Sequence, residues 1–142
     1  MFTSILVPFD GSVSSRKALL TAISMAKAFN SNLSIVSVEE NIPLVAADVG
    51  EVKEEKQYLN GHFSKLQRDA REIVKSNEMD LQRADILTGH VAKSIINHSI
   101  SIKSDLIVMG HSGRSGAWSN FLGTTAEKVS RYAKCTVMIV RQ

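Results

Sequence analysis

The residues best suited to chemistry lie in one glycine-rich segment near the C-terminus. This segment carries Gly110, Gly113 and Gly123, followed directly by the hydroxyl side chains of Thr124 and Thr125. Glycine lets a backbone turn sharply and approach a ligand closely, because no Cβ atom stands in the way. Main-chain N–H groups in such a loop, and at the start of a following helix, form a ready site for anions. The spacing therefore favours a loop that holds phosphate groups.

A purely structural interpretation of this loop stays open on the residues alone. Glycine-rich loops often follow strands without binding anything, and Thr124 with Glu127 three residues later matches a capping box. In that case Thr124 would serve only as the N-cap of a helix. Two better-known phosphate loops are absent, since the sequence contains no GxxxxGK[ST] segment and no GxGxxG after its first predicted strand.

Three further side chains are candidates for ligand contact. Asp10 follows the first predicted strand, where it could touch a ligand or simply form a turn or the N-cap of the next helix. His111 lies in the glycine loop, where we expect it to donate a hydrogen bond or to face solvent rather than to act as a catalytic base. Arg114 could make a bidentate contact with a terminal phosphate, or be solvated.

The sequence predicts no catalytic residue and no metal site. The other histidines lack metal-ligand spacing; His62 and His98 are interpreted as helix-surface residues and His90 as a loop residue. No Walker lysine, acidic metal cluster or poised general base is evident, so binding is favoured over fast catalysis. A receiver domain with a phosphoacceptor aspartate is disfavoured, because only one acidic residue, Asp10, follows the first predicted strand.

Short apolar runs alternate with helical patterns along the chain, which predicts an α/β fold with a parallel sheet covered by helices on both faces. Ligands bind such open sheets at the carboxyl ends of the strands. The third strand is the least apolar and is expected near an edge. The predicted strands are 5–7, 33–38, 81–88, 105–110 and 137–140, and the predicted helices are 13–29, 51–76, about 91–100 and 124–133.

Length and composition set the wider expectations. The 142 residues suit one domain spanning 1–142, and the net charge of +3 is too small to argue for nucleic acid. A single cysteine, Cys135, excludes an internal disulfide framework and fits a reducing compartment. The N-terminus does not match a signal peptide, and no apolar run reaches the roughly 18 residues of a membrane span. We therefore expect a soluble cytoplasmic protein without a membrane partner.

The glycine spacing resembles that of a known family. Gly110-x2-Gly113-x9-Gly123-Thr124 is similar to the ATP-binding signature of the universal stress proteins, G-x2-G-x9-G-[ST]. The opening segment 5–12 and the closing segments 126–129 and 132–141 resemble the same family, and the order of elements agrees throughout.

The resemblance implies a Rossmann-like sheet of the adenine nucleotide alpha hydrolase type, with strand order 3-2-1-4-5, and ATP as the ligand. It also implies a homodimer through the last strand, Thr136 to Val140, and allows Mg²⁺ or Mn²⁺ to accompany ATP. A slow ATPase and a nucleotide-free dimeric scaffold are the alternatives. The residues expected at the ATP site are Pro8, Phe9, Asp10, Val38, Gly110, His111, Gly113, Arg114, Gly123, Thr124 and Thr125.

Overall fold

Strands and helices alternate in a computed structural model, which describes residues 1–40, 49–112 and 121–141, without the side chains of 49–53 and 55. Every predicted element is present, and its ends shift by at most a few residues. The elements in these ranges are β1 (Ser4–Pro8), α1 (Val13–Phe29), β2 (Asn32–Glu39), α2 (Val49–Ser76), β3 (Arg83–Thr88), α3 (Val91–Ser101), β4 (Leu106–Gly110), α4 (Thr124–Tyr132) and β5 (Thr136–Val140).

The strands form one parallel sheet in the order β3-β2-β1-β4-β5, which confirms the predicted topology. In the central strand, Ile5 stands opposite Leu33 of β2 on one side and Leu106 of β4 on the other. β3 lies at one edge, as its weaker apolar character predicted, and β5 lies at the other. Because the strands are parallel, all five of their carboxyl ends lie at the same end of the sheet.

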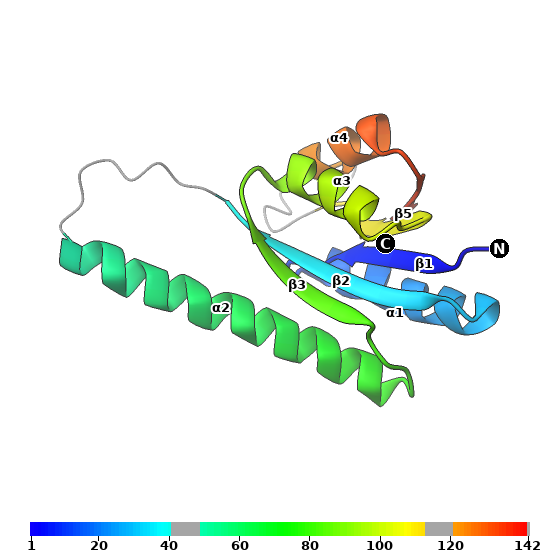
Figure 1. Cartoon of the computed structure of the whole chain (residues 1–142), viewed down its shortest axis with the longest axis horizontal. Helices are drawn as coiled ribbons and strands as arrows, with labels where there is room; N and C mark the ends of the chain where they lie inside the picture. Colours follow the sequence, from blue (N-terminus) through cyan, green and yellow to red (C-terminus); the bar gives the residue numbers. More distant parts are fainter. Residues whose placement is uncertain (41–48, 113–120, 142) are drawn as a thin grey trace.

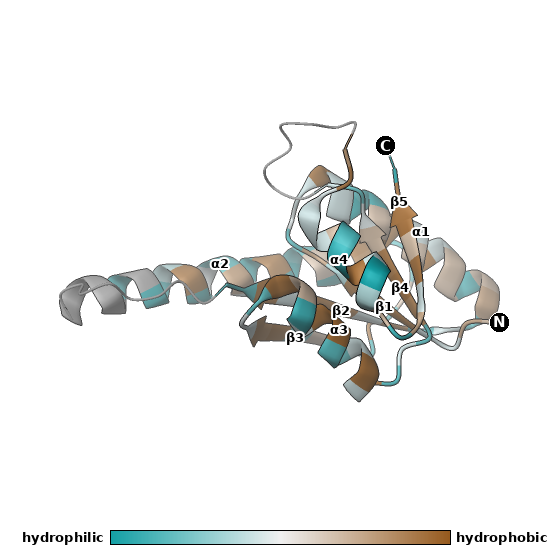
Figure 2. Cartoon of the chain, turned by 90° about the horizontal axis from the view of Figure 1, so that it is seen from above, coloured by the Kyte–Doolittle hydropathy of each residue, from teal (hydrophilic) through white to brown (hydrophobic). Residues whose placement is uncertain are grey.

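Helices cover both faces of the sheet, with α1 and α2 on one side and α3 and α4 on the other (Figure 1). The period-2 alternation of each strand divides its side chains between the two layers. In β1, Ile5 and Val7 pack with α1 and α2, whereas Leu6 packs with α3 and α4. Figure 2 shows the result as largely hydrophobic strands between helices in which hydrophobic and hydrophilic residues are mixed.

The helix α1 begins at a polar cap and ends at a left-handed residue. Ser12 is its N-cap, and the Ser12 hydroxyl accepts a hydrogen bond from the Ser15 N–H at 3.1 Å. Asn30 closes the helix with φ of 54°, a conformation that asparagine tolerates well. Asp10, the other N-cap candidate, instead forms a turn, because its Oδ1 accepts the Ser12 N–H at 2.9 Å.

The helix α2 is longer than the sheet that it covers. Its 28 residues span about 42 Å at roughly 1.5 Å per residue, and its first half extends past the strands (Figure 1). The second half is anchored by the buried residues Phe63, Leu66, Ala70 and Val74. Across the described ranges, no helix is both long enough and apolar enough to cross a membrane.

Asp105 joins the amino ends of β1 and β4. Its carboxylate accepts the Thr3 N–H at 2.9 Å, the Thr3 hydroxyl at 3.0 Å and the Ser4 N–H at 2.9 Å. Burial acts to raise the pKa of the Asp105 carboxyl, but the hydrogen bonds from Thr3 and Ser4 outweigh it and lower the pKa below its ordinary value. The charged form of Asp105 is therefore favoured by folding.

We predict that Asp105→Asn lowers the free energy of unfolding at pH 7 by about 1 kcal/mol, a small value because the carboxylate is partly solvated. Because folding lowers the pKa of the Asp105 carboxyl, the charged carboxylate stabilises the folded protein above the unfolded pKa of about 4. This stabilisation is lost as the pH falls through the lower pKa of the folded state. The gap between the two proteins should therefore close below pH 4. Urea unfolding at several pH values measures it, and a gap that stays constant with pH would contradict the assignment.

Candidate functional site

A cavity of about 500 Å³ opens at the carboxyl ends of β1, β2 and β4 and against the first turn of α4. This is the sheet edge at which open parallel sheets bind ligands, and the volume suits a small molecule. Gly113 and Arg114 lie outside the described residues. Every other residue that the sequence predicted for ligand contact lines the cavity: Pro8, Phe9, Asp10, Val38, Gly110, His111, Gly123, Thr124 and Thr125.

The end of β1 forms the floor of the cavity. Phe9 is 2% exposed, and its main chain is tied to β2 because its N–H donates to Val36 O at 2.9 Å and its carbonyl accepts the Ser37 hydroxyl at 2.6 Å. Asp10 follows at the turn. Phe9 and Asp10 therefore both line the cavity at the end of the central strand.

Gly110 ends β4 where the backbone passes directly against the start of α1. A Cβ atom at this position would lie 2.3 Å from Ser14 Oγ and 2.7 Å from the Ser14 carbonyl carbon, so only glycine fits. Ser14 Oγ also accepts the Ser112 N–H at 3.2 Å. The first glycine of the predicted loop therefore has a packing role, which brings the end of β4 close to the start of α1.

His111 is buried, so the expectation that it faces solvent is wrong. Its N–H donates to Val140 O at 3.1 Å, and its carbonyl accepts the Gly123 N–H at 2.9 Å, which ties β5 and α4 to the end of β4. The residue is 4% exposed, and its Nε2 has no hydrogen-bond partner among the residues that the structure describes. Buried polar atoms are normally paired, so this unpaired nitrogen is an unusual feature of a residue that lines the cavity.

The first turn of α4 reaches the cavity without a side-chain cap. Gly123, with φ of −60° and ψ of 150°, is the N-cap, so the predicted capping box with Thr124 as N-cap is wrong. Thr124 is instead the first helical residue, and Glu127 pairs with Arg131 at 3.0 Å. The N–H groups of Thr124, Thr125 and Ala126 lack helical partners by geometry, as in the first turn of any helix, and all three residues line the cavity.

The side walls come from two helices that the sequence did not assign to the site. Leu59 and Phe63 of α2, and Val91 and Ile95 of α3, line the cavity. Their helical spacing predicted core positions, and Phe63 and Ile95 are indeed buried. An apolar stripe looks the same for a core position and a cavity wall, so the sequence carried no signal to separate them.

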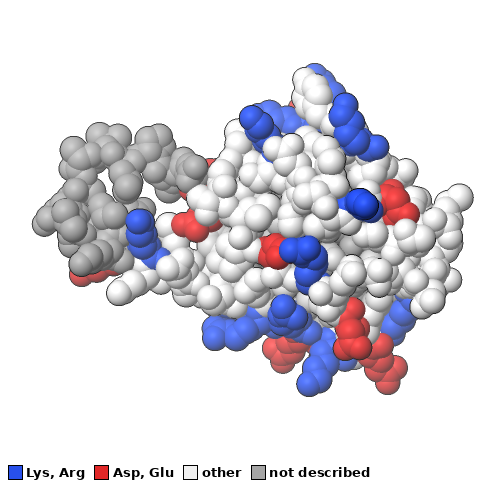
Figure 3. Space-filling model, viewed as in Figure 1, with Lys and Arg blue, Asp and Glu red and all other residues white. Residues whose placement is uncertain are grey.

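The charges around the cavity are unevenly distributed. Asp10, Glu39 and Glu40 line its β1 and β2 side, whereas its described lining residues include no Lys or Arg. In the described part of the lining, the donors for an anion are then main-chain amides of α4, the lining residue His111, and serine and threonine hydroxyls. Elsewhere, basic and acidic side chains are interspersed on the face that Figure 3 shows, in keeping with the small net charge of +3.

The remaining histidines have structural partners away from the cavity. His98 was predicted on the helix surface, but its side chain is only 9% exposed, and its Nε2 lies 3.0 Å from Asp85 Oδ2. Arg83 contacts the same carboxylate at 2.6 Å. His90 precedes α3 as its N-cap, consistent with the predicted loop position. In the ranges that the structure covers, no three His, Cys, Asp or Glu side chains are grouped to hold a metal ion.

Comparisons with known proteins agree with this architecture. The universal stress protein family matches residues 1–141. A universal stress protein from Thermus aquaticus is 32% identical over 141 residues, which cover 99% of this chain and all of the relative. The structure of the universal stress protein UspA from Lactobacillus plantarum has a TM-score of 0.85 at 22% identity, over 98% of this chain and 97% of that one. A universal stress protein solved in complex with cAMP has a TM-score of 0.74 at 25% identity, with the same coverage.

Proposed function

The chain belongs to the universal stress protein family, and from that premise we propose that its cavity binds an adenine nucleotide, with ATP as the expected ligand. The observation that carries this proposal is the uncapped start of α4 in the wall of the cavity, next to the lining residue His111, whose buried Nε2 has no partner among the described residues. A buried polar atom without a partner costs about 1–3 kcal/mol. A ligand oxygen at this point would remove that cost.

The phosphate groups are assigned to the α4 side of the cavity. The N–H groups of Thr124, Thr125 and Ala126 lie at the positive end of the helix dipole, which favours negative charge. The hydroxyl of Thr125 adds a donor on the same side. Each hydrogen bond to a charged phosphate contributes about 1.5–3 kcal/mol, so a few of them account for micromolar affinity. In this proposal Gly113 and Arg114 complete the phosphate contacts.

The base is assigned to the apolar middle of the cavity. Phe9, Val36, Val38 and Met109 line this part, and they come from three neighbouring strands. A flat, largely apolar purine gains by leaving water for such a surface. Asp10, at the end of the central strand, is placed to accept hydrogen bonds from ribose hydroxyls. The order of phosphate, ribose and base then follows the sheet edge from β4 to β2.

The relative solved with cAMP supports an adenine nucleotide as the class of ligand, because it shares 25% of its residues with this chain over nearly its whole length. ATP itself is the expectation from the glycine spacing. Mg²⁺ or Mn²⁺ would then be carried mainly by the phosphates and by water, since Mg²⁺ commonly keeps several waters in nucleotide sites. No protein-based metal cluster is required for that mode of binding.

The cellular role that fits such a site is a nucleotide-dependent regulatory module in a stress response, rather than a fast enzyme. A bound nucleotide would touch β1, β2, β4 and α4 at once, because residues from all four line the cavity. Binding of the nucleotide would thereby change the surface at the carboxyl ends of the strands, to which a partner protein could bind. Slow ATP hydrolysis and a nucleotide-free scaffold are the alternatives against which binding experiments test this role.

We also propose a homodimer through β5. This strand forms an edge of the sheet, and its apolar residues Val137 to Val140 are each only half-buried. Val140 O accepts a hydrogen bond from His111 N–H at 3.1 Å and therefore points toward β4. The main-chain N–H and carbonyl groups of neighbouring strand residues point to opposite sides. Those of Ile139 therefore face away from β4, toward the open edge of the sheet.

For the dimer, we expect the unaltered chain to sediment as a dimer at tens of micromolar and Ile139→Pro to sediment as a monomer. Proline removes an N–H donor on the open side of the strand and leaves the β4 hydrogen bonds of Val140 in place. A circular dichroism spectrum like that of the unaltered chain shows that the fold persists. A monomeric unaltered chain, or a dimeric Ile139→Pro variant, would contradict the proposal.

For the nucleotide site, we expect His111→Leu to weaken binding of AMP and ATP about tenfold, the worth of one hydrogen bond to a charged group. Binding of adenosine should change little, because it lacks phosphate. The melting temperature of the ligand-free variant should stay the same or rise, since leucine replaces a buried polar group that lacks a partner. Calorimetric titration with the three ligands and a thermal melt measure these effects.

The variant His111→Gln is the matched control, because a glutamine amide can place a donor near the position of the histidine Nε2. It should keep most of the affinity for AMP and ATP. If the unaltered chain binds none of the three ligands at millimolar concentration, the proposed function is wrong. If His111→Leu binds ATP as tightly as the unaltered chain, the role of His111 is wrong.

A further inference from the structure

We propose that Arg16 is a positioning residue for this site: it holds the turn that carries Asp10 and fastens that turn to α2. Two measurements test this inference. One of them, nucleotide affinity, rests on the proposed function, and the other, amide exchange in the ligand-free protein, does not. Arg16 lies in the first turn of α1 and is absent from the residues that line the cavity. Any effect of Arg16 on the ligand must therefore pass through its neighbours.

The guanidinium of Arg16 makes three contacts in different directions. Its Nε donates to the Gly11 carbonyl at 3.1 Å, and one of its terminal nitrogens lies 3.5 Å from Asp69 Oδ2 on α2. Its Cζ atom lies 5.8 Å from the centre of the Phe9 ring, within the range of a cation–π contact. A single side chain therefore touches the cavity floor, the turn after it and the neighbouring helix.

The turn needs such support at one particular place. Phe9 is held to β2 by its own N–H and carbonyl, and Ser12 is held as the cap of α1. Between them stand Asp10 and Gly11. The Gly11 carbonyl accepts the hydrogen bond from Arg16 Nε, so Arg16 restrains the Gly11–Ser12 peptide, whose N–H donates to Asp10 Oδ1.

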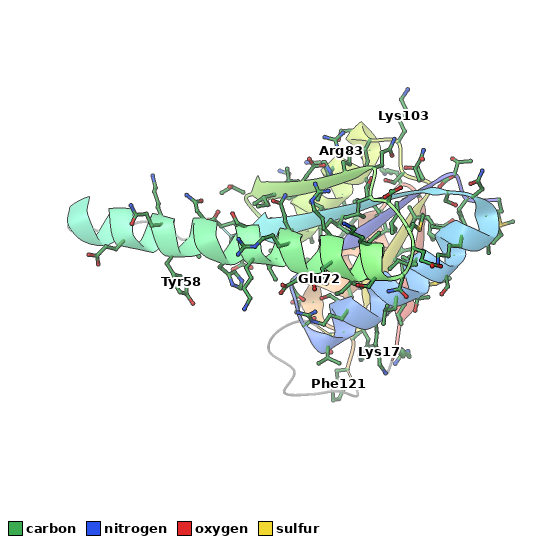
Figure 4. The ribbon with its side chains drawn as sticks, turned by 90° about the horizontal axis from the view of Figure 1, so that it is seen from below. Lys17, Tyr58, Glu72, Arg83, Lys103 and Phe121 are labelled. Atoms are coloured by element: carbon green, nitrogen blue, oxygen red, sulfur yellow. The ribbon has the colours of Figure 1, made fainter. Side chains whose placement is uncertain are left out.

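The turn also presses against α2. Gly11 has φ of 81°, and a Cβ atom there would lie 2.6 Å from Leu66 Cδ2, so the backbone and the helix are in close contact. Asp69 lies one helical turn beyond Leu66, and Phe63 one turn before it, on the same side of α2. Figure 4 shows α1 and α2 side by side on this face of the sheet. Through Asp69, Arg16 thus fastens the turn to the helix whose Phe63 lines the cavity.

Arginine suits this position better than lysine. Its planar fork presents separate N–H groups to the Gly11 carbonyl and to Asp69 while its Cζ atom lies over the Phe9 ring. A lysine ammonium is a point charge, which satisfies these partners less well at the same time. The side chain of Arg16 is 43% exposed, so its ion pair contributes little to global stability.

We expect Arg16→Ala to weaken the binding of adenosine, AMP and ATP by one common factor of about ten, the worth of one well-placed charged hydrogen bond. The factor is uniform because Asp10 is assigned to the nucleoside, which all three ligands share. A residue that only attracted phosphate by its charge would give losses that grow with the number of phosphates and shrink in salt. The melting temperature should fall by only a few degrees.

Two further variants separate position from charge. Arg16→Lys keeps the charge and should still lose most of the affinity that Arg16→Ala loses. Arg131→Ala removes a more exposed arginine with an ion pair on α4, outside the cavity lining, and should leave affinity unchanged. Affinity of Arg16→Lys equal to that of the unaltered chain, or an equal loss in Arg131→Ala, would overturn the inference.

A second readout needs no ligand. The Ser12 N–H is bonded to Asp10 Oδ1, so a loosened turn should exchange this amide about tenfold faster in Arg16→Ala, while amides in the centre of β1 keep their rates. Nuclear magnetic resonance of the ligand-free protein measures these rates. If the unaltered chain binds no nucleotide, the proposed function fails, and the exchange rate still decides the role of Arg16. If nucleotide binds but neither affinity nor exchange changes, only the role of Arg16 fails.

Discussion

The structure depends on one close approach of two backbones, where Gly110 at the end of β4 passes against Ser14 at the start of α1. Any side chain there would push the two elements apart. With glycine, the end of β4 lies against the start of α1, and His111 ties β5 and α4 to this point through its own N–H and carbonyl. The cavity exists because the end of β4, the turn after β1 and the first turn of α4 are held within reach of one another.

The same geometry explains how an anion could bind where no lysine or arginine lines the cavity among the described residues. Three carboxylates stand on the β1 and β2 side, and the opposite side offers main-chain amides and a buried imidazole. A ligand with an anionic end and a polar, hydrogen-bonding remainder fits this gradient in one orientation. A nucleotide has that character, and the apolar strand residues between the two sides suit its base. Arg16 acts outside this gradient, on the conformation of the turn.

Much of this architecture could be predicted from the sequence, because apolar strands, helical stripes and glycine spacing are local signals. The alternation of strands and helices in a parallel sheet followed from them, whereas the strand order was implied by the resemblance to the family. Other features depend on parts of the chain that are distant in sequence. Burial of His111 requires β5 and α4 to close around it, and the contact between Arg16 and Asp69 joins positions 53 residues apart. The capping box failed for a local reason: Gly123 takes the extended N-cap conformation, one residue earlier than Thr124.

The most direct test of the central claim is a nitrogen-15 resonance titration of the protein with ATP. The account predicts that the amides of Thr124, Thr125 and Ala126 and the ring nitrogens of His111 shift together, with one saturation curve. Amides in β3, away from the cavity, should stay in place. A titration in which ATP binds but these resonances do not move would contradict the account, as would the absence of any shift at millimolar ATP.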